Sequence, residues 1–150
     1  MKSIVVVATD EEYKLAQKRF KGHKIIQTGV GGINVYQTLK HVPRWRKITN
    51  FGYAGSNNIP IGTEVSIGFC EAYHPNANYM EPAWIIDDKK SNIWCCTSSD
   101  FVTETDIKEP CVFDMELAYI CAMGFKKVES IKIISDNLSL KQYEENIEKK

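Results

Sequence analysis

Three acidic residues of this chain lie within or just after apolar segments, where a carboxylate is unusual. Glu116 lies between apolar neighbours on a segment that otherwise has the composition of a core helix. A carboxylate in such surroundings is costly unless it has partners. Glu12 and Asp136 each come shortly after an apolar, β-branched run. Three acids without a cluster of metal-ligand type indicate acid–base chemistry on a neutral molecule rather than binding of a cation.

Each acidic position also has a purely structural interpretation. Glu12 comes three residues after Thr9, a pattern that suits a helix N-cap and an acidic first turn. Asp114 fits an N-cap as well, and Asp136 can cap the helix that follows it. The histidines are scattered without a serine or cysteine at the spacing of a catalytic triad, so we interpret them as surface residues. They are His23, His41 and His74.

Two glycine-containing segments follow predicted strands. Residues 29–32 read GVGG, and residues 52–55 read GYAG. Either segment could let a ligand approach the backbone, or could simply form a tight turn between a strand and a helix. Neither has the spacing of a dinucleotide-binding fingerprint or a P-loop, so no nucleotide phosphate is indicated.

The elements that must position these residues alternate between strand and helix in the first third of the chain. The expected strands cover residues 4–8, 24–28, 48–52, 63–70, 93–97 and 130–134. The expected helices cover residues 10–20, 33–41, 114–123 and 138–148. Open α/β sheets bring the polar residues that follow neighbouring strands into one cleft. The pattern therefore predicts a single domain over residues 1–150, an α/β fold built as a three-layer α/β/α sandwich with a central mixed sheet.

Composition narrows the class of protein further. The chain has 19 Lys and Arg against 19 Asp and Glu, a balance that argues against nucleic acid or anionic lipid as a partner. Its longest apolar run, residues 4–8, is far shorter than the ~20 residues of a membrane span, and its start lacks a signal peptide, so we expect a cytoplasmic protein. Five cysteines without a C-x-x-C pair predict neither a disulfide nor a zinc site. We expect no metal and no cofactor.

Taken in order, six short stretches resemble the nucleoside phosphorylase/nucleosidase superfamily, and within it the 5'-methylthioadenosine/S-adenosylhomocysteine nucleosidases. They read ATDEE (8–12), GVGGIN (29–34), NFGYAG (50–55), SDFV (99–102), DME (114–116) and ISDN (134–137). The stretches at 114–116 and 134–137 are the most specific. The resemblance implies a phosphorylase/hydrolase-like fold, a homodimer, and hydrolysis of the N-glycosidic bond of an adenine nucleoside with release of adenine. The chain is a shortened member, and the missing part lies between Pro82 and Ile93.

At the sugar, the resemblance implies roles for three residues. Glu12 activates the attacking water, Glu116 binds the ribose hydroxyls, and Met115 packs on the sugar. These roles agree with the chemistry, because cleavage of the glycosidic bond builds positive charge on the ribose and a carboxylate beside it is stabilising.

At the base, the resemblance implies that Asp136, assisted by Ser135, protonates or hydrogen-bonds the purine N7. Phe101 stacks on the base, the backbone of Val102 reads its edge, and Gly55 belongs to the substrate-binding set. An acid at this end lets adenine leave as a neutral molecule.

Two alternatives stay open at this point. Phosphorolysis needs an anion site, which the phosphorylases of the superfamily build with arginines near the glycine loops. The arginines of this chain, Arg19, Arg44 and Arg46, fall outside the matched stretches, which favours water over phosphate. The second alternative is a nucleoside-binding protein without turnover, and Tyr53, at a position that is usually small in the family, leaves the substrate open.

A homodimer is also expected from a concentration of apolar side chains around the loop at residues 73–82. Exposed patches of this kind usually mark an interface. The alternative is that these side chains close the core. They are Phe69, Tyr73, Tyr79, Met80 and Trp84.

Overall fold

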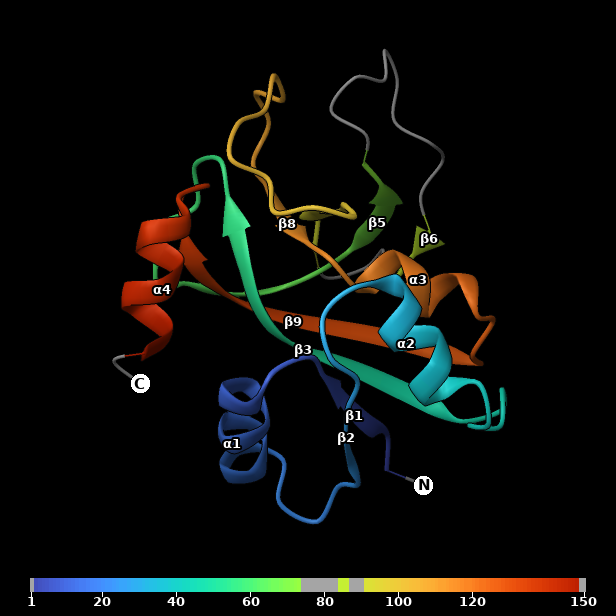
Figure 1. Ribbon diagram of the computed structural model, residues 1–150. Coiled ribbons are helices and arrows are strands. Elements are labelled where there is room, and N and C mark those ends of the chain that lie inside the picture. Colours follow the sequence, from blue (N-terminus) through green and yellow to red (C-terminus); the bar gives the residue numbers. More distant parts are fainter. Residues whose placement is uncertain (1, 74–83, 87–90, 149–150) are drawn as a thin grey trace.

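The computed structural model describes residues 2–73, 84–86 and 91–148, which form one mixed sheet with helices on both of its faces (Figure 1). The strands are β1 (Ile4–Val7), β2 (Ile25–Gln27), β3 (Lys47–Ser56), β4 (Glu64–Ser66), β5 (Phe69–Ala72), β6 (Trp84–Ile85), β7 (Trp94–Thr97), β8 (Cys111–Asp114) and β9 (Lys127–Asp136). The helices are α1 (Asp10–Arg19), α2 (Gly32–Leu39), α3 (Leu117–Ala122) and α4 (Leu140–Glu148). The α/β class with a central mixed sheet is confirmed.

The alternation of side chains along β1 explains why the sheet is covered on both faces. Val5 and Val7 pack with Ala16 of α1, whereas Ile4 and Val6 pack with buried side chains of α2. Figure 1 shows α1 and α4 on one side of the long strands and α2 and α3 on the other. A strand buried on both faces has to be apolar throughout, as the run at residues 4–7 is.

The long strand β3 is the centre of the sheet. Strand β9 runs parallel along one edge of β3 for nearly its whole length, from Lys47 to Gly55. On the other edge, β1 pairs with residues 48–50 and β8 pairs antiparallel with residues 55–56. Among the described strands, residues 51–54 therefore have a partner on the β9 edge only. The sheet splits at this point, and the candidate site lies in the split.

Four expectations about the strands were wrong in detail. Residues 52–55 continue β3 rather than forming a loop, and Ser135 and Asp136 end β9 across a bulge that pairs Asp136 with Gly55. The strand expected at residues 63–70 is two strands, because the chain leaves β9 and joins β7 at Gly68. The short strand β8 precedes the helix that was expected to begin at Asp114.

Two glycines of β3 leave room for acidic side chains against its backbone. A methyl group added at Gly52 would lie 2.5 Å from Oε2 of Glu12, and one added at Gly55 would lie 2.7 Å from Oδ2 of Asp136. Neither glycine has a positive φ. They are needed for space rather than for backbone conformation.

We expect Gly52→Ala to destabilise the protein by ~1–3 kcal/mol, the usual cost of overpacking a filled site. Urea unfolding of the single variant and of Gly52→Ala combined with Glu12→Ala forms a double-mutant cycle. If the clash with Glu12 is the cause, the added methyl group costs little once the carboxylate is gone. Equal costs in both backgrounds would show that another contact excludes the methyl group.

Candidate active site

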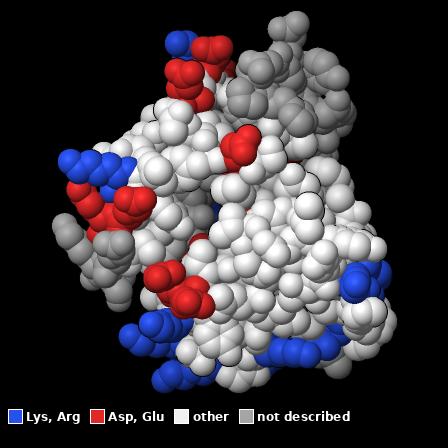
Figure 2. Space-filling view, in the orientation of Figure 1, with Lys and Arg blue, Asp and Glu red and all other residues white. Residues whose placement is uncertain are grey.

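A cavity of about 230 Å³ opens where β1 and β8 leave β3, and a smaller one of about 30 Å³ adjoins it. The face of the molecule in Figure 2 is hollowed near its middle. All the site residues predicted from the sequence line one or both cavities, with Val102 lining only the smaller. They are Glu12, Gly55, Phe101, Val102, Met115, Glu116, Ser135 and Asp136.

Glu12 reaches the larger cavity from the first turn of α1. Its Oε1 accepts hydrogen bonds from the backbone N–H groups of Ala8 at 2.8 Å and Thr9 at 3.2 Å, and its Oε2 accepts one from Tyr53 at 2.8 Å. Thr9 in turn accepts from the Glu12 N–H, so the pair forms a capping box. Because a carboxylate oxygen has two lone pairs, Oε2 keeps one for a further donor. Glu12 is therefore buried and holds the helix start, and it can still accept a proton.

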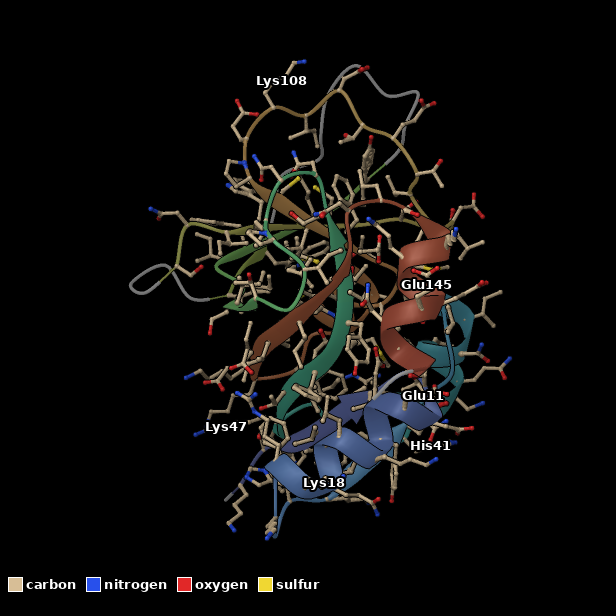
Figure 3. The ribbon with its side chains drawn as sticks, turned by 90° about the vertical axis from the view of Figure 1, so that its left-hand side faces the viewer. Glu11, Lys18, His41, Lys47, Lys108 and Glu145 are labelled. Carbon is tan, nitrogen blue, oxygen red and sulfur yellow. The ribbon has the colours of Figure 1, made fainter. Side chains whose placement is uncertain are left out.

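Burial raises the pKa of Glu12, while the three backbone hydrogen bonds and the charge of Lys132 act in the opposite direction. The structural interpretation of Glu12 as a solvated acid is wrong, since the side chain is only 6% exposed. Its neighbour Glu11 is the solvated residue and lies at the surface (Figure 3).

Asp136 closes the far end of β9. Its Oδ1 accepts from the Ser135 hydroxyl at 2.7 Å, and its Oδ2 accepts from the Leu138 N–H at 2.9 Å. Leu138 has a φ of 65°, so the chain turns sharply here and brings its own amide back to the carboxylate. Burial raises the pKa of Asp136 against these hydrogen bonds.

Glu116 is held by the glycine segment that follows β2. Its Oε2 accepts from the Gly31 N–H at 2.8 Å. Gly31 has a φ of 90°, a conformation that disfavours side chains, and nothing lies where its Cβ would be. The segment at 29–32 is thus a turn into α2, as one interpretation held, and its backbone also positions a cavity acid.

A buried ion pair beneath the cavity was missed from the sequence. Nζ of Lys132, in the middle of β9, lies 3.1 Å from Oδ2 of Asp114, and both side chains are almost fully buried. Asp114 also accepts from the Thr97 hydroxyl at 2.5 Å and from the Leu117 N–H at 2.8 Å. The expectation that Asp114 is the N-cap was wrong, because Asp114 ends β8 and the N-cap of α3 is Glu116, although the Asp114 carboxylate still accepts from the first amide of the helix. The sequence did contain a signal for this ion pair, namely a lysine inside an otherwise apolar strand. A lysine that is buried in a strand needs an acidic partner.

Aromatic side chains cover the cavity on the side of α1 and α4. Phe101 meets Tyr143 of α4 edge to face, with ring centroids 5.6 Å apart, and Tyr53 lines the same wall. Burial and the nearby acids raise the pKa of Tyr143 to about 12. Tyr143 was not among the site residues predicted from the sequence, and α4 contributes it to the lining of the cavity.

The cavity is electrically negative. Asp114 and Lys132 balance each other, whereas Glu12, Glu116 and Asp136 have no second lysine or arginine among the residues that line the cavity. Arg19 pairs with Glu64 at the surface, and Arg44 donates to the backbone carbonyl of Met123. Fixed negative charge of this kind favours a substrate that becomes positive in the transition state and disfavours an anion such as phosphate.

Within the described ranges, no group of three or more His, Cys, Asp or Glu residues is arranged to hold a metal ion. The same residues include no helix long and apolar enough to cross a membrane. His23 is half-buried and His41 is exposed, in agreement with surface positions, and His74 lies outside the described residues.

Stability should depend on pH through Glu116. Burial, and after it the charge of Asp114, raises its pKa from 4.5 to about 7. The folded protein therefore holds this proton more tightly than the unfolded chain does, so the contribution of Glu116 to stability is present below about pH 4.5 and is lost as the pH rises through about 7. Relative to the parent protein, Glu116→Gln should gain stability between these values, by up to ~3 kcal/mol.

Urea unfolding at a series of pH values measures this difference directly. Glu144→Gln, which changes an exposed carboxylate on α4, is the matched control and should show no such trend. A constant difference between Glu116→Gln and the parent protein across the series would contradict the proposed titration.

Solved structures with the same fold include several nucleosidases. MTAN from Chlamydia trachomatis bound to MTA has 15% sequence identity and a TM-score of 0.78, over 98% of this chain and 90% of that one. S-adenosylhomocysteine nucleosidase from Streptococcus pyogenes, in complex with 5-methylthiotubericidin, has 18% identity and a TM-score of 0.73, over 99% and 92%. Futalosine hydrolase of Helicobacter pylori has 14% identity and a TM-score of 0.74, over 99% and 91%.

No family model and no curated protein matches the sequence. The likeness to the solved structures extends over almost the whole chain. The chain therefore shares the fold of these nucleosidases.

Proposed function

We propose that this protein hydrolyses the N-glycosidic bond of adenine nucleosides of the 5'-methylthioadenosine or S-adenosylhomocysteine type and releases adenine. The observation that carries the proposal is the convergence of Glu12, Glu116 and Asp136 on one negative cavity with an aromatic wall. The resemblance of the sequence and the ligands of similar structures, MTA and 5-methylthiotubericidin, support the same class of substrate.

At the base end, Asp136 supplies the proton. As the bond between C1' and N9 breaks, its electron pair moves onto the purine, and a proton from Asp136 to N7 lets adenine leave as a neutral molecule. The Ser135 hydroxyl, which donates to Oδ1, stabilises the carboxylate that remains. Phe101 stacks on the base, and the backbone of Val102 contacts its edge.

At the sugar end, the bond cleavage leaves positive charge on the ribose. Glu116 accepts hydrogen bonds from the ribose hydroxyls while the Gly31 N–H holds its Oε2, and Met115 packs against the sugar. A water molecule bound to the free lone pair of Glu12 attacks C1' and gives its proton to that carboxylate. The charge of Lys132 and three backbone amides oppose the rise that burial causes in the pKa of Glu12. The proposed step requires Glu12 to be ionised while Asp136 carries the proton.

Water is favoured over phosphate because of the charge of the cavity. A phosphate anion would have to enter a site that already contains three acids, and the arginines of the chain do not line it. A binding protein without turnover is the other alternative. A protein that only binds a nucleoside needs no acid beside the base together with a second carboxylate, beside the sugar, that has a free lone pair.

The purified protein is expected to release adenine from 5'-methylthioadenosine at the same rate with and without phosphate. A coupled assay for adenine on 5'-methylthioadenosine, S-adenosylhomocysteine and a panel of other adenosine derivatives measures this. Release that requires phosphate would assign the protein to phosphorolysis. An inactive protein that still binds adenine nucleosides would support the binding alternative.

Asp136→Asn and Glu12→Gln should each lower kcat by at least ~10²-fold, the lower scale for a positioned acid or base. Glu12→Gln also loses a hydrogen-bond acceptor for a buried amide, so part of its effect is a loss of stability of ~1–3 kcal/mol. Glu11→Gln, one position away and exposed, is the matched control and should keep full activity. Activity in Glu12→Gln close to that of the control, in folded protein, would assign Glu12 to the helix cap alone.

The protein is further proposed to act as a homodimer through an uncharged surface over α2 and α3. Figure 2 shows this region almost free of Lys, Arg, Asp and Glu. Its exposed apolar side chains are Val30, Ile33, Tyr36 and Tyr119. Because Val30 also lines the cavity, a second copy on this surface would close the site.

Two of the five apolar residues that first indicated a dimer are engaged elsewhere. Tyr73 is buried against Phe113, and Phe69 stacks on Trp94 with ring centroids 4.9 Å apart, so these side chains close the core. Trp84 is 39% exposed, and Tyr79 and Met80 lie outside the described residues.

Ile33→Glu should convert the dimer to a monomer, because Ile33 is 76% exposed and a charge there would be buried in the interface. Light scattering at micromolar concentration gives the mass directly. Leu140→Glu, a comparable change at an exposed residue of α4, should leave the mass unchanged. A parent protein that is monomeric under these conditions would contradict the dimer.

A further inference from the structure

The sheet carries a second cavity, away from the candidate active site, on the face of β5, β7 and β8 opposite α3. Along β5 and β7, Cys70 and Cys95 point towards α3 and belong to its core cluster. The alternate residues Glu71 and Cys96 are partners in the strand register and share the other face. In the part of the chain that the structure describes, this face is covered by the segment between β7 and β8 rather than by a helix (Figure 1).

The cavity on this face has a volume of about 300 Å³ and shares no lining residue with the candidate active site. Its walls are formed by Trp94, Ile107 and Pro110, and the thiols of Cys96 and Cys111 lie on its sheet side. This size and this apolar lining are typical of sites for small organic molecules.

Glu71 is the buried charge in this cavity. Its side chain is only 2% exposed, and its hydrogen-bond partner in the structure is the Cys96 thiol at 3.6 Å. A thiol is a weak donor. The other buried carboxylates are held by stronger donors: Glu12 by three backbone amides, Asp136 by a hydroxyl and an amide. Among the described residues, Glu71 thus has no strong donor of the kind that a buried carboxylate needs.

The described residues that line the cavity do not supply Glu71 with a cation. Lys108, on the segment that walls the cavity, is exposed at its tip and points away from the sheet (Figure 3). Glu109 lines the cavity as well and adds a second negative group. The hydrogen bond to Cys111 and burial keep the pKa of the Cys96 thiol far above its usual range, so Cys96 stays a neutral thiol rather than a metal-binding thiolate.

We propose that this cavity is a binding site for a small organic ammonium ion, a primary amine on an apolar or aromatic body, whose nitrogen pairs with Glu71. The carbon part of such a ligand fits between Trp94 and Ile107, and its N–H groups provide the charge-assisted hydrogen bonds that Glu71 lacks. A neutral molecule of the same shape would leave the carboxylate unpaired. This site does not depend on the proposed nucleosidase activity.

The test is a titration of the full-length protein with 2-phenylethylammonium chloride at constant ionic strength, followed by two-dimensional amide NMR. Saturable shifts are expected at the amides of Cys96 and Cys111. The neutral isostere 2-phenylethanol should bind at least ~10-fold more weakly, because a charge-assisted hydrogen bond is replaced by a neutral one. Glu71→Gln should weaken amine binding by a similar factor, whereas Glu104→Gln, an exposed carboxylate of the same segment, should not.

Two further variants keep the test decisive. Ile107→Trp fills the cavity from its outer wall and should abolish binding while Glu71 stays unchanged. This variant tests the proposal even if Glu71→Gln does not fold. Glu116→Gln, in the candidate active site, should leave amine binding unchanged. Equal affinity for the amine and the alcohol, unchanged binding in Glu71→Gln, or shifts confined to the residues around Glu116 would each overturn the proposal.

Discussion

The candidate site depends on how closely two carboxylates approach the backbone of one strand. Glu12 and Asp136 come from opposite ends of the chain, and both lie where a side chain of β3 would otherwise be, at Gly52 and Gly55. The split in the sheet makes this possible, because β1 has ended and β8 has not yet begun, so the Tyr53 N–H is available to Glu12. The same strand therefore carries the sheet and fixes the acids relative to each other.

Charge inside the site is only partly balanced. Lys132 neutralises Asp114, and its field reaches Glu12 and Glu116 without forming an ion pair with either. Burial then raises the pKa of all three cavity acids, most clearly that of Glu116. The hydrogen bonds that oppose this effect differ: three backbone amides act on Glu12, a hydroxyl and backbone amides on Asp136, and the Gly31 amide on Glu116.

The sequence was informative where local pattern and chemistry agree. The apolar run at residues 4–7, the capping pattern from Thr9 to Glu12 and the order of the short motifs led to the fold and to the lining of the cavity. Features that depend on distant parts of the chain were missed. Three of them can be recognised only when it is known which strand or helix lies opposite. They are the pairing of Lys132 with Asp114, the change of strand partner at Gly68 and the position of Tyr143 in the lining of the cavity. Glu71 shows the same limit, because nothing in its neighbours along the chain indicates that its carboxylate is buried.

The loss of stability caused by the buried acids and the proposed chemistry of the site have the same electrostatic origin. Three buried acids beside a single, already paired lysine destabilise the folded protein, since the ionised form of each acid is poorly solvated there. A ribose that becomes positive as its glycosidic bond breaks supplies the charge that the cavity lacks, and it does so most fully in the transition state. Binding energy is then realised where it lowers the barrier rather than in the ground state. A more stable arrangement, with a second lysine or arginine among the acids, would satisfy the carboxylates in the absence of substrate and remove that advantage.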